Sequence, residues 1–137
     1  MVLGIDFGDS RTGFAISDSL EMMASTVETF KEKNMKKVVL RAVELQKELG
    51  ADKIVLGFPK NMNGTVGDRG KKSQKFAKEL RTLTDVPVIL WDERLTTVSA
   101  HNLMNETNVR GAKRKDSVDK IAAAFILQSY LDSQKNA

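Results

Sequence analysis

Cysteine is absent from the 137 residues, and histidine occurs only once, at His101. Without cysteine the chain has no disulfide, no thiolate metal site and no cysteine nucleophile. A single histidine excludes a zinc site built from several imidazoles, so any bound metal must be held by Asp and Glu oxygens. These absences direct the search for chemistry to the acidic side chains.

Long apolar runs are also missing, since none approaches the roughly 18 residues that a membrane span needs. Aromatic residues make up 6% of the chain and do not interleave with basic ones, so stacking on single strands is not indicated. The 41% hydrophobic and 29% charged content is typical of a globular protein. We expect residues 1–137 to form a single cytoplasmic domain with no membrane span and no signal segment.

Basic residues exceed acidic ones, giving a formal net charge of +4. They gather in two segments, with seven Lys/Arg against two acids from Lys60 to Arg81 and five against two from Arg110 to Lys120. Such clusters suit a polyanion such as nucleic acid, although charged runs also form ordinary solvated surfaces. Charge alone leaves both interpretations open.

Apolar periodicity predicts the order of secondary structure. Strands are expected at 2–7, 12–18, 23–29, 53–58 and 87–91, and helices at 35–49, around 76–83, at 95–105 and at 117–131, with a mobile basic loop at 106–115. Three strands followed by alternation predict an α/β protein whose mixed sheet begins with antiparallel hairpins and continues with parallel crossovers. In such sheets, sites collect beyond the carboxyl ends of the parallel strands.

Asp6 lies inside the first apolar run, in the stretch VLGIDF. An ionised carboxylate among apolar residues costs several kcal/mol unless something compensates its charge. A divalent cation at the end of the strand would supply that charge. Asp6 is therefore the first candidate metal ligand.

Glu93 lies just past the last expected strand, in WDERLT. A purely structural interpretation is also open, in which Asp92 or Thr96 caps the next helix and Glu93 pairs with Arg94 or a lysine. If Glu93 converges with other acids, the carboxylates repel one another without metal. With two Mg²⁺ ions about 3.5–4 Å apart, they form the clamp used for phosphodiester hydrolysis.

Asp116 and Asp119 are three residues apart and share a face at the start of the last expected helix. The structural alternative is that Asp116 or Ser117 is the N-cap and Asp119 is favoured by the helix dipole. The functional alternative places Asp119 beside Asp6 and Glu93. Spacing alone does not decide between them.

Four segments in order, GIDFGDSRTGFAISD, VLGFPKNMNGTVGDR, DERLTTVSA and KDSVDKIAAAFILQSYL, resemble the YqgF (RuvX) family over nearly the whole chain. That family is described both as Holliday junction resolvases and as pre-16S rRNA nucleases. The resemblance implies an RNase H-like fold with strand order 3-2-1-4-5. It also implies a Mg²⁺ or Mn²⁺ site at Asp6, Glu93 and Asp119, while Asp116 matches the first acid of a D-x-x-D pattern in related resolvases and ranks fourth.

One feature departs from the pattern of RNase H-like nucleases, which generally carry their second acid on the fourth strand. Here that strand ends in LGFPKN, without an acid. Glu93 follows the fifth strand instead, two strand spacings or about 10 Å from Asp6 between backbones. A glutamate side chain that reaches inward past its strand end would close this gap.

Candidate nucleic-acid contacts surround these acids. Arg11 follows Gly8 in the first loop, where it would either hold a phosphate or pair with Asp9. The segment NMNGTVGDR is a candidate substrate loop in which Asn63-Gly64 forms a turn. The full set of expected contacts is Arg11, Lys60, Asn61, Arg69, Lys71, Lys72, Arg94, Lys113, Arg114 and Lys115.

Three classes of function follow. The first is a metal-dependent endonuclease acting on the 5′ region of pre-16S rRNA or, alternatively, on a four-way DNA junction, for which a two-fold homodimer is expected. The second is a nucleic-acid-binding ribosome-assembly factor without cleavage. The third is an ATPase, because DFGDSRTG also resembles the first phosphate loop of the actin and sugar-kinase group. Those enzymes close two domains around the nucleotide, whereas 137 residues supply one.

Overall fold

The computed structural model describes residues 1–95 and 111–135, and the side chains of residues 1–94 and 120–135. Its sheet has five strands in the order β3-β2-β1-β4-β5. The strands are β1 (Val2–Asp6), β2 (Arg11–Ser17), β3 (Ala24–Lys31), β4 (Lys53–Phe58) and β5 (Val88–Asp92). Pairing is antiparallel between β1, β2 and β3 and parallel between β1, β4 and β5. The predicted mixed sheet and its strand order are confirmed.

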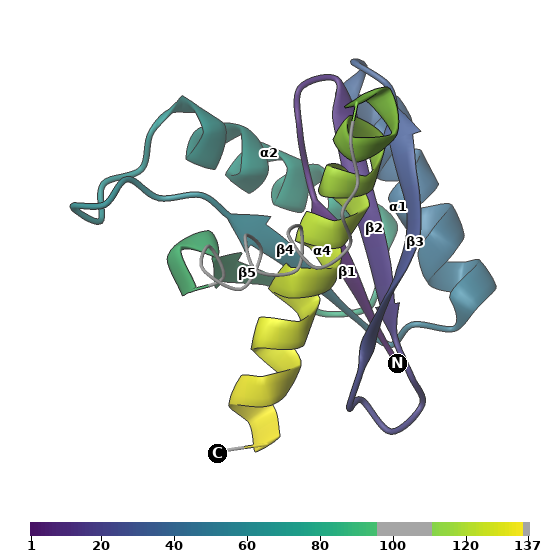
Figure 1. Ribbon diagram of the computed structural model, residues 1–137. Helices are drawn as coiled ribbons and strands as arrows, with labels where there is room; N and C mark the ends of the chain where they lie inside the picture. Colours follow the sequence, from purple (N-terminus) through teal and green to yellow (C-terminus); the bar gives the residue numbers. More distant parts are fainter. Residues whose placement is uncertain (96–110, 136–137) are drawn as a thin grey trace.

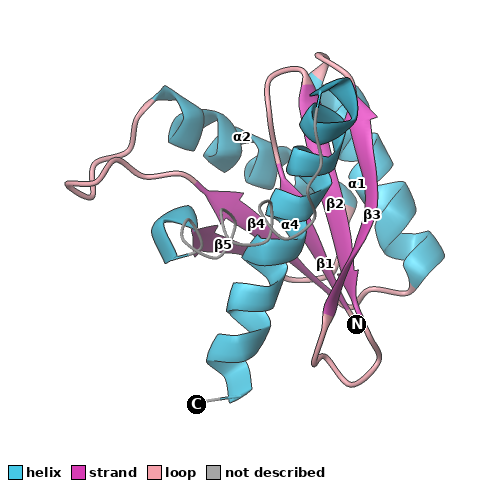
Figure 2. Ribbon diagram, in the orientation of Figure 1, coloured by secondary structure: helices cyan, strands magenta, loops and turns pink. Residues whose placement is uncertain are grey.

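Helices cover both faces of this sheet. The helical elements are α1 (Met35–Leu49), α2 (Asp68–Leu83), the short 3₁₀ turn η1 (Glu93–Leu95) and α4 (Gly111–Lys135). α4 crosses one face, while α1 and α2 lie on the other (Figures 1 and 2). Because side chains alternate along a strand, the core has two layers. Leu3 and Ile5 pack on the side of α1 and α2, and Val2 packs on the side of α4.

α4 lies directly on the backbone of β1. A Cβ atom on Gly4 would come within 2.7 Å of the Leu127 Cβ and 3.1 Å of the Ala123 carbonyl oxygen. Only glycine permits this approach, so Gly4 sets how closely the helix packs on the sheet. In Figure 1, β1 runs toward the end of the molecule at which α4 begins. The start of α4 therefore lies at the carboxyl ends of the parallel strands.

α1 follows the prediction, whereas α2 begins at Asp68, well before the segment 76–83 in which a helix was expected. α1 spans the predicted residues, begins at the Asn34 cap and ends at Gly50, whose φ of 69° suits glycine. In α2, Phe76 and Leu80 are buried as expected. Leu83 is 49% exposed. As the last residue of α2, it lines a shallow groove against α1 instead of entering the core.

The segment before the last helix differs from the prediction of a mobile loop at 106–115, because residues from Gly111 onward are helical. No glycine or proline interrupts 112–135, so nothing in the sequence stops the helix from extending through its basic turn. Asp116 and Ser117 thus lie inside α4 and neither is its N-cap. The helix predicted at 95–105 lies almost entirely outside the described residues. Within the described part of the chain, no helix is long and apolar enough to cross a membrane.

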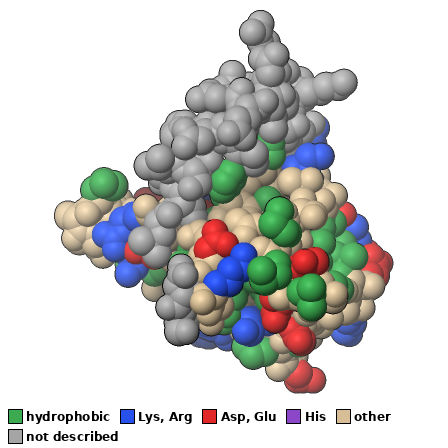
Figure 3. Space-filling view, turned by 60° about the horizontal axis from the view of Figure 1, so that its bottom comes forward, with side chains coloured by type: hydrophobic (Ala, Val, Ile, Leu, Met, Phe, Trp, Pro, Cys, Tyr) green, Lys and Arg blue, Asp and Glu red, His purple; other side chains and the backbone are tan. Residues whose placement is uncertain are grey.

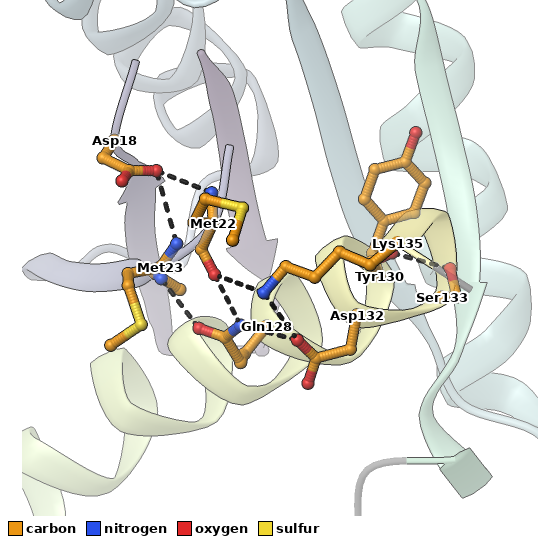
Figure 4. Close-up of polar contacts among 9 residues, drawn as sticks. Asp18, Met22, Met23, Gln128, Tyr130, Asp132, Ser133 and Lys135 are labelled. Atoms are coloured by element: carbon orange, nitrogen blue, oxygen red, sulfur yellow. Dashed lines mark hydrogen bonds and ion pairs between the residues drawn. The ribbon is translucent and has the colours of Figure 1, made fainter. Parts of the chain in front are cut away.

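The far end of α4 is fastened to the turn between β2 and β3 (Figure 4). The Gln128 side chain accepts a hydrogen bond from the Ala24 N–H at 2.8 Å and donates one to the Met22 carbonyl at 3.0 Å. Lys135 donates to the same carbonyl at 3.0 Å. These contacts hold the carboxyl-terminal part of α4 against the turn between β2 and β3.

Candidate active site at the carboxyl ends of the parallel strands

Asp6 is the last residue of β1, the central strand of the sheet. Side chains alternate along a strand, so Asp6 shares the face of Gly4, over which α4 packs. Its side chain is half-buried. The predicted position at the carboxyl end of a buried strand is confirmed, on the side covered by α4.

Glu93 is the first residue of η1 and follows β5, two strands away from β1. Its side chain reaches back across β4. The Glu93 Oε1 lies 2.6 Å, and its carboxyl carbon 3.2 Å, from the place that a Cβ on Gly57 would occupy. The carboxylate therefore lies over β4, one strand closer to Asp6 than its own backbone does.

The register of β1 and β4 shows how close the two acids come. Ile5 pairs with Leu56, so Gly57 follows at the level of Asp6. The Glu93 carboxylate covers Gly57 on the α4 face, where the neighbouring strand carries Asp6. Adjacent strands lie about 4.8 Å apart. The structure thus brings Asp6 and Glu93 to neighbouring positions on one face of the sheet.

Asp119 lies in the helix that crosses above these two acids. It precedes Ala123 by four residues and Ile126 by seven, which is the spacing of one helix face. The Ala123 carbonyl oxygen approaches Gly4 of β1, and the Ile126 Cδ1 approaches Gly57 of β4. The backbone position of Asp119 is therefore one turn further along α4 toward the carboxyl ends of the strands. Asp116 lies almost one turn before it.

The side chains of residues 111–119 lie outside the described part of the structure, and these include Lys113, Arg114 and Lys115. Among the side chains that are described, no group of three Asp, Glu, His or Cys residues could hold a metal ion. The described part of the site consists of the pair formed by Asp6 and Glu93. Whether a third acid completes the site depends on Asp119.

Arg94 is held by its neighbour Asp92. Its guanidinium contacts the Asp92 carboxylate through Nη2 at 2.7 Å and Nε at 3.0 Å, and its backbone N–H donates to the same carboxylate at 3.0 Å. Asp92 thus caps the short turn η1, whereas the helix that it was considered to cap lies almost entirely outside the described residues. The hydrogen bonds from the Arg94 side chain hold the pKa of Asp92 below its usual value. Asp92 therefore stays ionised and fixes the guanidinium beside Glu93.

The loop between β4 and α2, residues 59–67, projects from the same edge of the sheet (Figure 1). Its turn is confirmed at Asn63-Gly64, where Gly64 has a φ of 85° and donates its N–H to the Asn61 carbonyl at 2.8 Å. Asn61 also donates to Thr65 through its backbone and its side chain, both at 2.9 Å. Met62 is 90% exposed on this turn, whose hydrogen bonds lie within the loop itself.

Basic side chains lie around the base of this loop. In the space-filling view, Lys and Arg side chains gather behind the projecting loop at the left, whereas charges of both signs mix over the rest of that face (Figure 3). Lys60, Asn61 and Arg69 line a cavity of about 290 Å³ at the beginning of α2. A Cβ on Gly64 would lie 3.8 Å from the Arg94 Nη1, so Arg94 reaches the same loop.

Lys72 and Lys71 continue this basic surface along α2, and both are exposed. Lys72 binds the Asp9 carboxylate at 2.9 Å, which ties the β1–β2 turn to α2. From the sequence, Arg11 is a possible partner of Asp9, whereas Lys72 is not indicated. No local pattern could have indicated a partner 63 positions away.

The chain is similar to known proteins over nearly its whole length. The family model described as "RuvX: Holliday junction resolvase" matches residues 1–133. A "Putative pre-16S rRNA nuclease" of Bacillus subtilis is 52% identical over 134 residues, covering 96% of this chain and 97% of the relative. A protein of the same name from Clostridium tetani is 48% identical over 135 residues and covers 98% of each chain.

Solved structures share the fold at low sequence identity. Thermus thermophilus RuvC in complex with a Holliday junction substrate has a TM-score of 0.65 at 13% identity, covering 97% of this chain and 95% of that one. The fowlpox virus resolvase bound to Holliday junction DNA has a TM-score of 0.58 at 15% identity, covering 97% of each. These likenesses confirm the RNase H-like fold, and the family match shows that this chain belongs to the RuvX family.

Proposed function

We propose that this protein is a metal-dependent endonuclease that hydrolyses phosphodiester bonds in the 5′-end processing of pre-16S rRNA. Residues 1–137 act as one cytoplasmic nuclease domain. The observation that carries the proposal is the Glu93 carboxylate lying over Gly57, beside the strand that ends in Asp6. The relatives named for pre-16S rRNA cleavage support the choice of substrate.

The residues present fit a divalent cation. Two carboxylates on neighbouring strands repel each other, and a cation between them removes that cost. Carboxylate oxygens are ligands for Mg²⁺ and Mn²⁺, which need no thiolate and no cluster of imidazoles. Asp6, Glu93 and Asp119 would hold the metal, with Asp116 as a fourth acid. A metal held there would supply activation of a water molecule and stabilisation of the leaving oxygen.

Lysine and arginine side chains around the site would bind the substrate. Lys60 and Arg69 line the cavity at the base of the loop beside the acids, and Arg94 reaches the same loop. All three are proposed to contact phosphates of the substrate. Asp92 fixes Arg94 in one orientation, so that its position does not depend on substrate. Further contacts are proposed for Arg11, Asn61, Lys71, Lys72, Lys113, Arg114 and Lys115.

A four-way DNA junction is the second candidate substrate. It is favoured by the description of the family model and by two structural neighbours that are in complex with Holliday junctions. Symmetric cleavage of a junction requires two active sites, so this function predicts a two-fold homodimer. A monomer that cleaves only the RNA would argue against it.

The test is cleavage of labelled 5′ pre-16S RNA and of a four-way DNA junction with Mg²⁺ or Mn²⁺. Glu93→Gln removes the charge of the carboxylate that lies over Gly57 while keeping its size. Glu21→Gln, in the exposed turn at the opposite end of the sheet, is the matched control. We expect specific cleavage by the wild type and the control and none by Glu93→Gln.

The outcomes separate the hypotheses. The preferred substrate assigns RNA or DNA. Binding without cleavage, equal in the wild type and Glu93→Gln, would contradict the nuclease and favour an assembly factor. Tight ATP binding would favour the third class instead.

A further inference from the structure

Gly57 occupies a position in the interior of β4, where glycine is unfavourable. A glycine inside a strand weakens it and often marks a place where another group approaches the backbone closely. Among the described glycines, only Gly50 and Gly64 have positive φ, so the backbone conformation at Gly57 does not require glycine. We therefore look for a group that occupies the position of the missing Gly57 side chain.

Two side chains fill that space. A Cβ on Gly57 would lie 2.5 Å from the Ile126 Cδ1 and 2.6 Å from the Glu93 Oε1. Ile126 is one of the buried residues of α4 that form an apolar core layer with the sheet, so its contact with Gly57 is ordinary packing. The contact with Glu93 is different, because a carboxylate takes the place next to the backbone that a β4 side chain would fill.

We propose that Gly57 is a positioning residue of the active site: by having no side chain, it admits the Glu93 carboxylate from the end of β5 to the place beside Asp6 that an acid on β4 would hold. This inference rests on the proposed function. It accounts for the departure noted in the sequence, where the fourth strand lacks the acid that RNase H-like nucleases generally carry. The acid comes from the next strand, and the fourth strand leaves room for it.

Gly4 shows what a purely structural glycine looks like on the same face of the sheet. A Cβ on Gly4 would meet the Leu127 Cβ and the Ala123 carbonyl oxygen, which cannot move without moving α4. At Gly57 both clashing atoms are the far ends of flexible side chains. A methyl group on Gly57 is therefore expected to displace Glu93 and Ile126 while the fold is retained. Metal binding and stability should respond differently at the two glycines.

The experiment compares wild type, Gly57→Ala, Gly57→Ala/Ile126→Val and Gly4→Ala. Mn²⁺ affinity is measured by calorimetry, Tm without metal by thermal unfolding, and activity by the cleavage assay. We expect Gly57→Ala to lower Mn²⁺ affinity about 10–100-fold, the usual cost of misplacing a metal ligand. Ile126→Val removes the clashing Cδ1 but gives Glu93 no room, so the double variant should recover Tm and keep the weak affinity.

Gly4→Ala should lower Tm more than Gly57→Ala does, because its clash is with the body of α4, and any loss of Mn²⁺ affinity should accompany that loss of Tm. Normal affinity in Gly57→Ala, or affinity restored by Ile126→Val, would show that Gly57 serves packing alone and would overturn the inference. Mn²⁺ binding that depends on Gly57, in a wild type that cleaves neither substrate, would overturn the proposed function and leave the inference standing. A wild type that binds no Mn²⁺ would overturn both.

Discussion

The two ends of the layer between the sheet and α4 use polar side chains in opposite ways. At the β2–β3 turn, each polar group faces a complementary one: Asp18 accepts the Met22 N–H at 2.7 Å, and Gln128 and Lys135 donate to the Met22 carbonyl. At the other end, the Asp6 and Glu93 carboxylates come to neighbouring positions. The first arrangement stabilises the fold. The second brings like charges together, which is a cost unless a ligand of opposite charge joins them.

This contrast indicates that stability and function are separated along α4. Gln128 and Lys135, near the end of the helix, anchor it, while the backbone of Asp119, which we propose as a metal ligand, lies near its start. Substitutions at the two ends should therefore have opposite consequences. The predictions below test this separation in order of decreasing expected effect.

Asp6→Asn should have the largest effect on activity and almost none on the stability of the metal-free protein. Losing a group that supports transition-state charge costs several kcal/mol, or about 10³-fold in rate. The free energy of unfolding without metal should change much less, because asparagine keeps the size of the side chain and an oxygen that accepts hydrogen bonds. Cleavage assays and urea unfolding with and without Mg²⁺ measure both. Wild-type protein should gain stability with Mg²⁺, and the variant should not.

A loss of stability in metal-free Asp6→Asn would contradict the comparison, since it would mean that Asp6 serves the fold as Asp18 does. Identical unfolding of the wild type with and without Mg²⁺ would contradict the account of why an acid is tolerated at this position.

Gln128→Ala should show the reverse. It removes the acceptor of the Ala24 N–H and a donor to the Met22 carbonyl. The Met22 carbonyl keeps the hydrogen bond from Lys135, and leaving the Ala24 N–H without its acceptor costs about 1–3 kcal/mol of unfolding free energy. The rate of cleavage by folded protein should not change. Urea unfolding is the measurement, with Gln134→Ala as control, whose described side-chain contact is to the adjacent Ser133. Equal stability of the two variants would disprove the anchoring role.

The sequence predicted the fold more fully than the site. The mixed sheet followed from the three-strand beginning and the later alternation, because both patterns are local and leave few topologies. The strand order was implied by the resemblance to the YqgF family. The start of α4 was missed by several residues, since polar residues such as Lys113 and Asp116 continue a helix as readily as they form a loop. The Gln128 anchor joins residues more than 100 positions apart, and no local pattern reveals it.

For the site, the sequence nominated Asp6 and Glu93 but left a gap of two strands between them. Three features together close this gap. The strand register places Gly57 level with Asp6, Gly57 has no side chain, and η1 directs the Glu93 side chain over β4. Gly57 and Glu93 can both be read in the sequence, but their proximity follows only from the pairing of the strands. The glycine in LGFPKN was a usable signal, because a mid-strand glycine marks a close approach.

Lys60→Ala tests the end of the layer that carries Asp6 and Glu93, and it separates substrate binding from the rate of cleavage. The Lys60 ammonium lies 5.6 Å from the Phe58 ring centre, beside the cavity at the start of α2. Losing one phosphate contact should weaken binding severalfold and lower the slope of log affinity against log salt by about 0.7–0.9. Cleavage at saturating substrate should be unchanged. Lys47→Ala, at the end of α1, is the control. Equal salt slopes in the wild type and Lys60→Ala would remove Lys60 from the interface.

Asp18→Asn tests the stabilising end and should have the smallest effect, confined to acid pH. Hydrogen bonds from the Met22 and Met23 N–H groups hold the pKa of Asp18 below its ordinary value of 3.8. A carboxyl group with a lowered pKa stabilises the folded state above its unfolded pKa, and this stabilisation is lost as pH falls through the lower folded value. Wild-type Tm should therefore drop more steeply below about pH 4 than that of the variant, which keeps an acceptor oxygen but does not titrate. Asp85→Asn, in an exposed turn, controls for the change in net charge. Parallel Tm profiles for all three proteins would mean that the charge of Asp18 does not stabilise the turn, and the contrast between the two ends would then rest on Gln128 and Lys135 alone.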